Sequence, residues 1–189
     1  VLPWVAGLRE GHATEALQHL NAGADGVWLT YKGTESIASL LDGVHPEHCH
    51  LAFAPEKSDV DSLDAVLNLL DHRGIVRSGG SLFWTRIPDD AWNILKSAIA
   101  KHSEFQLLGL HVPSKESLSE EIAYALTMAV SCLNELGRDA ANAICFSFRA
   151  SNDFYENVVR YRTVGLLWNR IRADHGLPPA PKPFLHALI

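Results

Sequence analysis

Three histidines lie close together in the sequence and could offer imidazole ligands to a metal ion: His45, His48 and His50. A metal site needs three or four donor atoms that converge on one point, usually from separate segments of the chain. On an extended strand His48 and His50 share one face while Cys49 points the other way, so at most two imidazoles converge. We therefore interpret the cluster as a polar approach to a strand and expect no metal site. A metal-dependent barrel hydrolase built on these histidines is the alternative.

A second group of candidates lies in the basic segment 146–172. Arg149 directly follows an apolar run, and Arg160 and Arg162 lie in the helical pattern behind it. The planar donors of arginine suit phosphate, so these three residues are candidates for binding a phosphate-bearing ligand. Arg160 and Arg162 are two positions apart and cannot share one helix face. The alternative is a helix with a solvated basic side. Its buried stripe would consist of Val158, Tyr161, Gly165 and Trp168.

His111 ends another apolar run and is the one catalytic candidate that we name. In a barrel of parallel strands the carboxyl ends of the strands hold the ligand site, which favours a polar role for this side chain. A lone histidine at such a position is otherwise a structural residue. The sequence has no HExxH or GxSxG motif and no paired carboxylates that we interpret as a catalytic motif, and the glycine-containing stretch 74–80 lacks the spacing of a phosphate-binding loop.

Elements that could position these residues follow from apolar runs that alternate with helical periodicity. The expected strands are residues 4–8, 26–30, 51–54, 81–84, 106–110, 144–148 and 184–188. The expected helices are residues 14–22, 36–41, 62–70, 89–100, 118–136 and 153–175. Ser117 and Glu120 have the spacing of a capping box, and Gly137 is the expected end of the helix that they begin.

This alternation predicts an α/β fold of parallel strands joined by right-handed crossovers. Seven strand–helix units exceed the five or six strands of a usual open sheet, whereas a (β/α)8 barrel needs about 250 residues. We therefore expect one domain over residues 1–189, a TIM-type (β/α)8 barrel that is incomplete at one or both ends.

Composition narrows the function further. Hydrophobic residues make up 47% of the chain and charged residues 20%, and the formal net charge is −6. An acidic chain without a long apolar run is expected to bind neither nucleic acid nor a membrane. No secretory signal pattern opens the sequence, and the cysteines, Cys49, Cys132 and Cys145, form no CxxC pair. These features favour a reducing, cytoplasmic setting.

Several segments, in the right order along the chain, resemble the methylmalonyl-CoA mutase family and specifically its small subunit. Residues 121–126 (EIAYAL) match the family's ELAYAL helix, with Cys132-Leu133 at a suitable distance behind it. Residues 146–168 resemble the family's strand–loop–helix pattern FxxxxxxFxxxxKxRAxRxLW. The positions in register are Phe154, Arg160, Arg162, Leu167 and Trp168. Shorter resemblances occur at residues 20–27 (LNAGADGV), 40–44 (LLDGV) and 185–187 (LHA).

The resemblance implies a (β/α)8 barrel that threads the coenzyme A chain through its centre. In the catalytic subunit of the family a separate C-terminal domain holds adenosylcobalamin, whose cobalt–carbon bond breaks to give the radical that interconverts methylmalonyl-CoA and succinyl-CoA. It also implies that Arg162 corresponds to an arginine associated with the phosphates of coenzyme A, and that Arg160 stands where the motif has lysine. By the same resemblance, His111 would correspond to a histidine near the substrate carbonyl.

Departures from the family pattern decide which subunit we expect. The cobalamin-binding signature DxHxxG does not occur in these residues, and the loop 111–117 is shorter than the family's and has no glycine. We expect a noncatalytic small subunit with a degenerate site of its own, which binds no cofactor itself and pairs with a large subunit that carries adenosylcobalamin. The alternative is a stand-alone protein or enzyme that binds a CoA ester through Arg149, Arg160 and Arg162, with His111 as a polar group.

Overall fold

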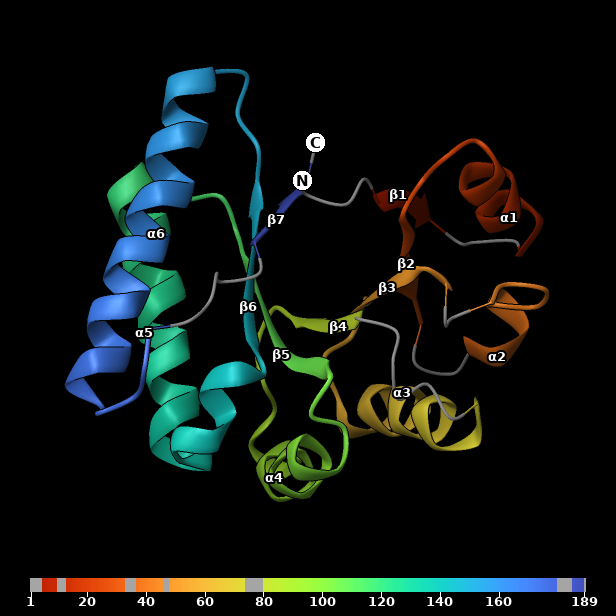
Figure 1. Cartoon of the computed structure of the whole chain (residues 1–189), viewed down its shortest axis with the longest axis horizontal. Coiled ribbons are helices and arrows are strands. Elements are labelled where there is room, and N and C mark those ends of the chain that lie inside the picture. Colours follow the sequence, from red (N-terminus) through yellow and green to blue (C-terminus); the bar gives the residue numbers. More distant parts are fainter. Residues whose placement is uncertain are drawn as a thin grey trace. The chain divides into compact units, whose positions relative to one another are not determined.

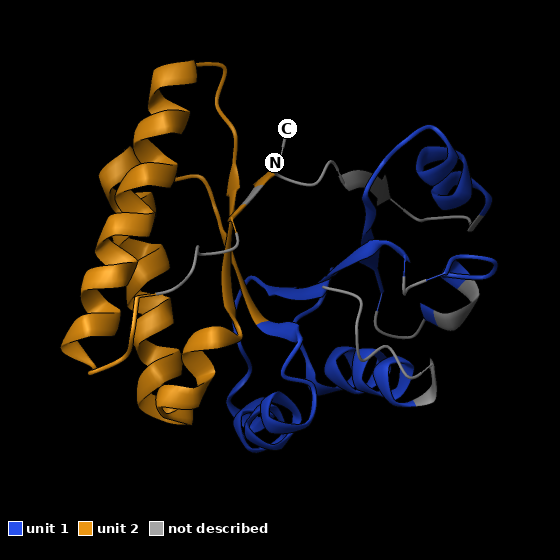
Figure 2. Ribbon diagram, viewed as in Figure 1, with its two compact units in different colours: residues 1–107 blue, residues 108–189 orange. Residues whose placement is uncertain are grey.

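The computed structural model describes residues 5–9, 13–32, 37–45, 48–73, 80–179 and 185–188. Strands and helices alternate along these residues, and the strand pairings within each unit are parallel (Figure 1). The chain divides into two compact units, residues 1–107 and residues 108–189, which Figure 2 shows in different colours. The boundary between the units falls inside β5 (Phe105–Val112).

Unit 1 contains four strands and the first residues of β5. The strands are β1 (Val5–Arg9), β2 (Gly26–Tyr31), β3 (His50–Pro55) and β4 (Gly80–Trp84). The helices are α1 (Ala13–Asn21), α2 (Ile37–Leu40), α3 (Val60–Arg73) and α4 (Trp92–Lys101). Each strand pairs with the next one along the chain, from β1 to β4.

Aromatic side chains pack on both faces of the strands in unit 1. On one face, the hydroxyl of Tyr31 donates a hydrogen bond of 2.9 Å to the carbonyl of Ser62 in α3, and its ring meets Phe53 edge to face. Since successive strand residues alternate between faces, Trp28 lies on the other face of β2. There it stacks on Phe83 of β4, with ring centroids 4.6 Å apart. α3 therefore lies against the face that carries Tyr31, and Trp28 and Phe83 share the opposite face.

Unit 2 contains the remainder of β5 and two further strands. They are β6 (Ile144–Arg149) and β7 (Leu185–Leu188), in the order β5-β6-β7. The helices are α5 (Leu118–Leu136) and α6 (Phe154–Asp174), and a 3-10 helix occupies Arg138–Asn142.

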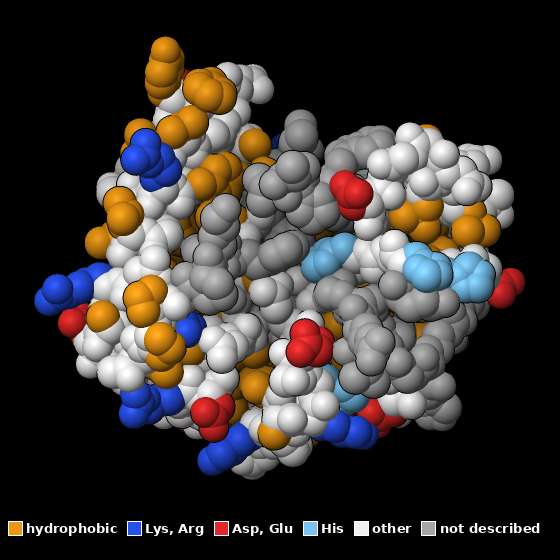
Figure 3. All heavy atoms as spheres, viewed as in Figure 1, with side chains coloured by type: hydrophobic (Ala, Val, Ile, Leu, Met, Phe, Trp, Pro, Cys, Tyr) orange, Lys and Arg blue, Asp and Glu red, His pale blue; other side chains and the backbone are white. Residues whose placement is uncertain are grey.

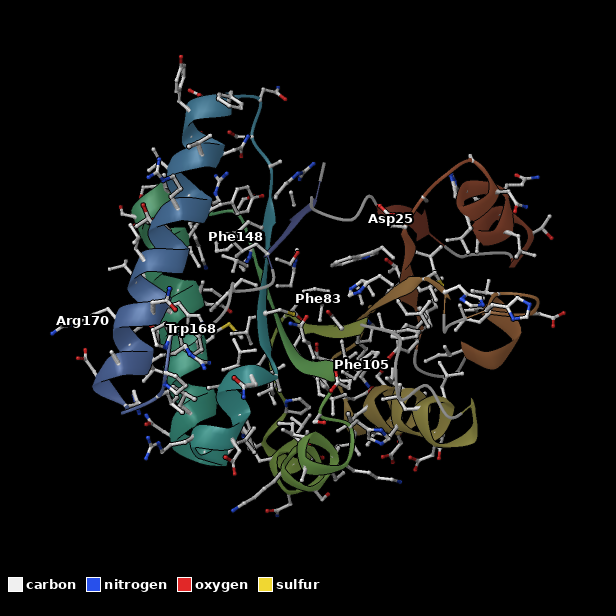
Figure 4. All side chains as sticks on the ribbon, viewed as in Figure 1. Asp25, Phe83, Phe105, Phe148, Trp168 and Arg170 are labelled. Atoms are coloured by element: carbon white, nitrogen blue, oxygen red, sulfur yellow. The ribbon has the colours of Figure 1, made fainter. Side chains whose placement is uncertain are left out.

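Two phenylalanines of β6 fix the face that α6 covers. Phe146 meets Trp168 with centroids 5.7 Å apart, and Phe148 meets Tyr161 at 6.1 Å, both edge to face. Figure 4 shows Phe148 between β6 and α6, while Arg170 points away from the helix. Edge-to-face aromatic pairs are favourable beyond their buried area, so these contacts hold α6 against the sheet.

The expected elements are present in the part of the chain that the structure describes. Each of the seven expected strands occurs, with its ends within two residues of those predicted. α5 begins with the predicted capping box: the Glu120 amide donates to Ser117 Oγ at 3.3 Å, and the Ser117 amide donates to a Glu120 carboxylate oxygen at 3.2 Å. Gly137 ends the helix with a φ of 84°, a conformation that glycine adopts without a steric penalty.

One expected helix differs from the structure at its start. The helix expected over residues 89–100 starts as a 3-10 turn at Asp89–Ala91, and only then continues as α4. A complete (β/α)8 barrel is not shown, because the described residues form seven strands. Within its own unit β1 pairs only with β2, and β7 only with β6. The glycine-containing stretch at residues 74–79 lies outside the described residues. No described helix is both long and apolar enough to cross a membrane.

Candidate functional site

Polar residues of three neighbouring strands share one level of the sheet in unit 2. His111 of β5 is in register with Ser147 of β6, and Ser147 is in register with His186 of β7. Residues that pair in parallel strands lie on the same face, and Phe146 and Phe148 take the α6 face. The side chains of His111 and Ser147 therefore lie on the face opposite α6, near the carboxyl ends of their strands. We call these two residues the polar row.

The geometry of the polar row is defined best between His111 and Ser147. The imidazole Nδ1 of His111 lies 3.5 Å from Ser147 Oγ, which is the outer limit of a hydrogen bond. Ser147 is fully buried and His111 half-buried. Burial lowers the pKa of His111 below its usual range, since desolvation disfavours the imidazolium. The row consequently holds a neutral imidazole beside a hydroxyl at neutral pH.

Arg149 lies two residues beyond Ser147, so it extends from the same face one step closer to the end of β6. Its side chain is exposed, and it forms no ion pair within the described part of the chain. A guanidinium beside a neutral imidazole and a hydroxyl could hold an anionic or carbonyl oxygen by hydrogen bonds. The residue types suit binding of a polar group at this end of the sheet.

Acyl transfer fits the polar row poorly. A serine nucleophile needs a basic partner that is itself oriented by a third group, and it must be reachable by the substrate. Ser147 has no exposed surface, and among the described residues no carboxylate is hydrogen-bonded to His111. We therefore regard the pair as a binding element rather than a catalytic dyad.

Arg160 does not join Arg149, because its donors are used inside the fold. Its Nε donates to Glu121 Oε2 at 3.0 Å, its Nη1 to Asn157 Oδ1 at 2.7 Å and its Nη2 to Glu156 Oε1 at 2.6 Å. The side chain is only 3% exposed. Arg162 lies on the exposed side of α6, as its offset of two residues requires. The three predicted phosphate-binding arginines thus point in three different directions.

The buried stripe of α6 differs from the predicted one. The buried side chains of α6 are Arg160, Val164, Trp168 and Arg172. Arg172 is held by three acceptors: the carbonyls of Ala141 and Pro178 and the side-chain oxygen of Asn142. The expectation of a solvated basic side is therefore wrong for Arg160 and Arg172. Trp168 is buried as expected, whereas Val158, Tyr161 and Gly165 are half-buried.

The histidine cluster is spread over a turn and a strand end. The His48 amide donates to the His45 carbonyl at 3.0 Å, so His48 belongs to a turn and does not share an extended strand with His50. The rings of His45 and His48 lie 6.3 Å apart, and both residues are exposed. His50 begins β3 and is half-buried. Among the described residues no group of three His, Cys, Asp or Glu side chains could hold a metal ion.

Burial at the start of β3 predicts a pH-dependent stability. Desolvation lowers the pKa of His50 from 6.5 to about 4. As the pH falls, His50 therefore becomes protonated near pH 6.5 in the unfolded chain but only near pH 4 in the folded chain. The free energy of unfolding should therefore fall over this window as the pH drops, by up to about 3 kcal/mol from this group. Urea unfolding at a series of pH values measures it.

The matched variants for this prediction are His50→Gln and His48→Gln. His50→Gln should flatten the pH profile between 6.5 and 4, because glutamine does not titrate. His48→Gln is the matched control for removing a nearby histidine, since His48 is exposed and lies in the turn. Parallel profiles for the wild type and His50→Gln would contradict the prediction.

Comparison with known proteins identifies no family. No protein-family model matches the chain, and no curated protein matches it.

Ser147 is the residue of the polar row that the motifs did not single out. The alternation within residues 144–148 (ICFSF) could have pointed to it. There Ser147 stands between two phenylalanines, so on a strand it lies on the face opposite to theirs. The alignment of Ser147 with His111 could not be found this way, because register across strands depends on how the strands pair.

Proposed function

We propose that the chain is the small, noncatalytic subunit of a methylmalonyl-CoA mutase-type heterodimer. It would pair with a cobalamin-bearing large subunit that interconverts methylmalonyl-CoA and succinyl-CoA, and it would support the fold of that subunit. An incomplete (β/α)8 barrel as a single domain belongs to the same proposal. So does a cytoplasmic location, which is supported by the three cysteines, since all are buried and none forms a disulfide.

The ion pair between Arg160 and Glu121 carries the proposal. These residues belong to the two segments with the most extended resemblance to the family, and in the structure they join α5 to α6 at 3.0 Å. The same pair supports a noncatalytic role. An arginine at the lysine position of the family's KxR motif is turned into the helix packing, so it is not available to a coenzyme A phosphate.

Adenosylcobalamin does not fit the residues of this chain. Its binding signature DxHxxG is not found in the 189 residues, and the described residues offer no cluster of ligands for a metal. We therefore assign the cofactor to the large subunit and no step of the rearrangement to this chain. Radical chemistry needs a cofactor held in a sealed site, and the polar row offers only neutral hydrogen-bonding groups and Arg149.

The mass of the native assembly tests this proposal. The full-length chain is measured alone and after co-expression with its large mutase subunit. We expect a stable one-to-one complex, with mutase turnover only when the large subunit and adenosylcobalamin are present. Turnover by the isolated chain with adenosylcobalamin would overturn the proposal, and so would the absence of a complex with the large subunit.

The polar row favours a second candidate function, a stand-alone protein that binds a CoA ester. Arg149 is exposed on the same face as His111 and Ser147, so a ligand's anionic group and carbonyl could be held together. The site residues of this candidate are Arg149 and His111. Arg162 lies on α6, outside the polar row, and is not part of this site.

Calorimetric titration with coenzyme A separates the two candidates. If the polar row binds the ligand, Arg149→Ala should weaken binding by at least about tenfold, because a charge-assisted contact to phosphate is lost. Arg162→Ala is the matched control, since Arg162 lies on the exposed side of α6, and it should change the affinity less than about twofold. Absence of any binding heat in the wild type would rule out this candidate and leave the subunit proposal as it stands.

A further inference from the structure

α6 carries a second apolar stripe on the side that faces solvent. Tyr155 is 79% exposed, Val159 51% and Leu166 70%, whereas Trp168 on the other side is 1% exposed. Figure 3 shows hydrophobic side chains gathered over this helix, with Lys and Arg side chains among them. Scattered apolar residues are normal on a protein surface, but an aligned set on one helix marks an interaction site. We call Tyr155, Val159, Arg162 and Leu166 the exposed seam.

The spacing of the exposed seam is that of a helix–helix contact. Its four residues follow at steps of four, three and four, which is the repeat by which the a and d positions of a coiled coil meet a partner helix. Ala173, another seven residues on, continues the same line. With 21 residues, α6 is about 32 Å long, enough to pair with a whole partner helix.

Charge indicates what kind of helix fits. The acidic residues of α6 are engaged: Glu156 binds Arg160 at 2.6 Å and Asp174 binds Arg170 at 3.3 Å. Arg162 lies in the middle of the seam and forms no ion pair among the described residues. Arg162 is the one charged residue of the seam, and its positive charge on a chain of net charge −6 favours a partner that brings carboxylates.

A second copy of α6 fits less well than a different protein. An antiparallel pair of α6 helices about a twofold axis near the middle of the seam would bring the two Arg162 side chains close together. Like charges placed so in an interface oppose association. From the seam and its charge we propose that α6 is a docking surface for a partner helix with an apolar stripe flanked by Asp and Glu. We identify this partner as the large mutase subunit, an assignment that rests on the proposed function.

Two probes and one matched control variant test the docking surface. The first probe is the large mutase subunit. The second is a pair of labelled amphipathic peptides with the same leucine stripe, flanked by glutamate in one and by lysine in the other. The seam is broken by Val159→Ser together with Leu166→Ser. The control is Leu167→Ser, which removes the neighbouring exposed leucine from a position a quarter-turn off the seam.

We expect the glutamate peptide to bind the chain and the lysine peptide to bind at least about tenfold more weakly. The double variant should lose at least about tenfold in affinity for the glutamate peptide and for the large subunit, and the control less than about twofold. Arg162→Glu should invert the preference between the peptides. Far-ultraviolet circular dichroism confirms that each variant keeps its helix.

The outcomes separate this inference from the proposed function. A large subunit that binds the wild type and the double variant equally would overturn the docking surface and leave the subunit proposal standing. Peptide binding without large-subunit binding would overturn the subunit proposal and support the surface. A wild type that dimerises with rising concentration, and a double variant that does not, would make a second copy the occupant and overturn the partner proposed here. Absence of binding to either probe would overturn both.

Discussion

Replacing Arg160 by alanine is expected to lower the free energy of unfolding by about 3–5 kcal/mol, because it leaves the carboxylate of Glu121 buried without its charged partner. The two side chains are 3% and 10% exposed, and their atoms lie 3.0 Å apart. Arg160 also joins Asn157 and Glu156, so the variant loses three hydrogen bonds at once. Urea unfolding of the full chain, followed by circular dichroism, measures the loss.

A paired variant tells charge burial apart from lost packing. Arg160→Met combined with Glu121→Leu removes both charges and keeps apolar side chains of similar size, so it should recover most of the loss. Arg162→Ala, two residues away and exposed, should change the stability by less than about 0.5 kcal/mol. A loss below about 1 kcal/mol in Arg160→Ala would show that Glu121 finds another partner or reaches water.

Trp84→Ala should be about as damaging, with an expected loss of about 3–5 kcal/mol. The indole has no exposed surface, and its Nε1 donates a hydrogen bond of 2.8 Å to the carbonyl of Leu107. Alanine leaves a cavity in the core of unit 1 and removes the bond that ties β4 to the start of β5. The stability is again read from urea unfolding of the full chain.

Trp84→Phe divides this effect into its two parts. Phenylalanine keeps most of the buried ring but cannot donate, so it should cost about 1–3 kcal/mol for the carbonyl of Leu107 left without its donor. Trp92→Phe at the half-buried start of α4 is the control and should cost less than about 1 kcal/mol. Equal losses in Trp84→Phe and Trp92→Phe would mean that the hydrogen bond contributes nothing measurable.

Local patterns in the sequence were sufficient to predict the positions of the strands and helices. Strand positions followed from apolar runs, and the ends of α5 followed from Ser117, Glu120 and Gly137, because caps act on the backbone within a few residues. The same dependence on neighbouring residues limits these patterns. Nothing in the residue types around His48 reveals the hydrogen bond from its amide to the His45 carbonyl, which places His48 in a turn.

The sequence by itself therefore determined the α/β alternation, the parallel strands and the helix caps of this protein. Tertiary structure alone decided what the charged residues of α6 do. Periodicity assigns arginine to solvent because an isolated buried charge is costly, but Glu121 and the carbonyl of Ala141 supply partners that make burial of Arg160 and Arg172 tolerable. The tertiary structure also decided the alignment of His111 with Ser147, because these residues are 36 positions apart in the sequence and meet only through the register between β5 and β6.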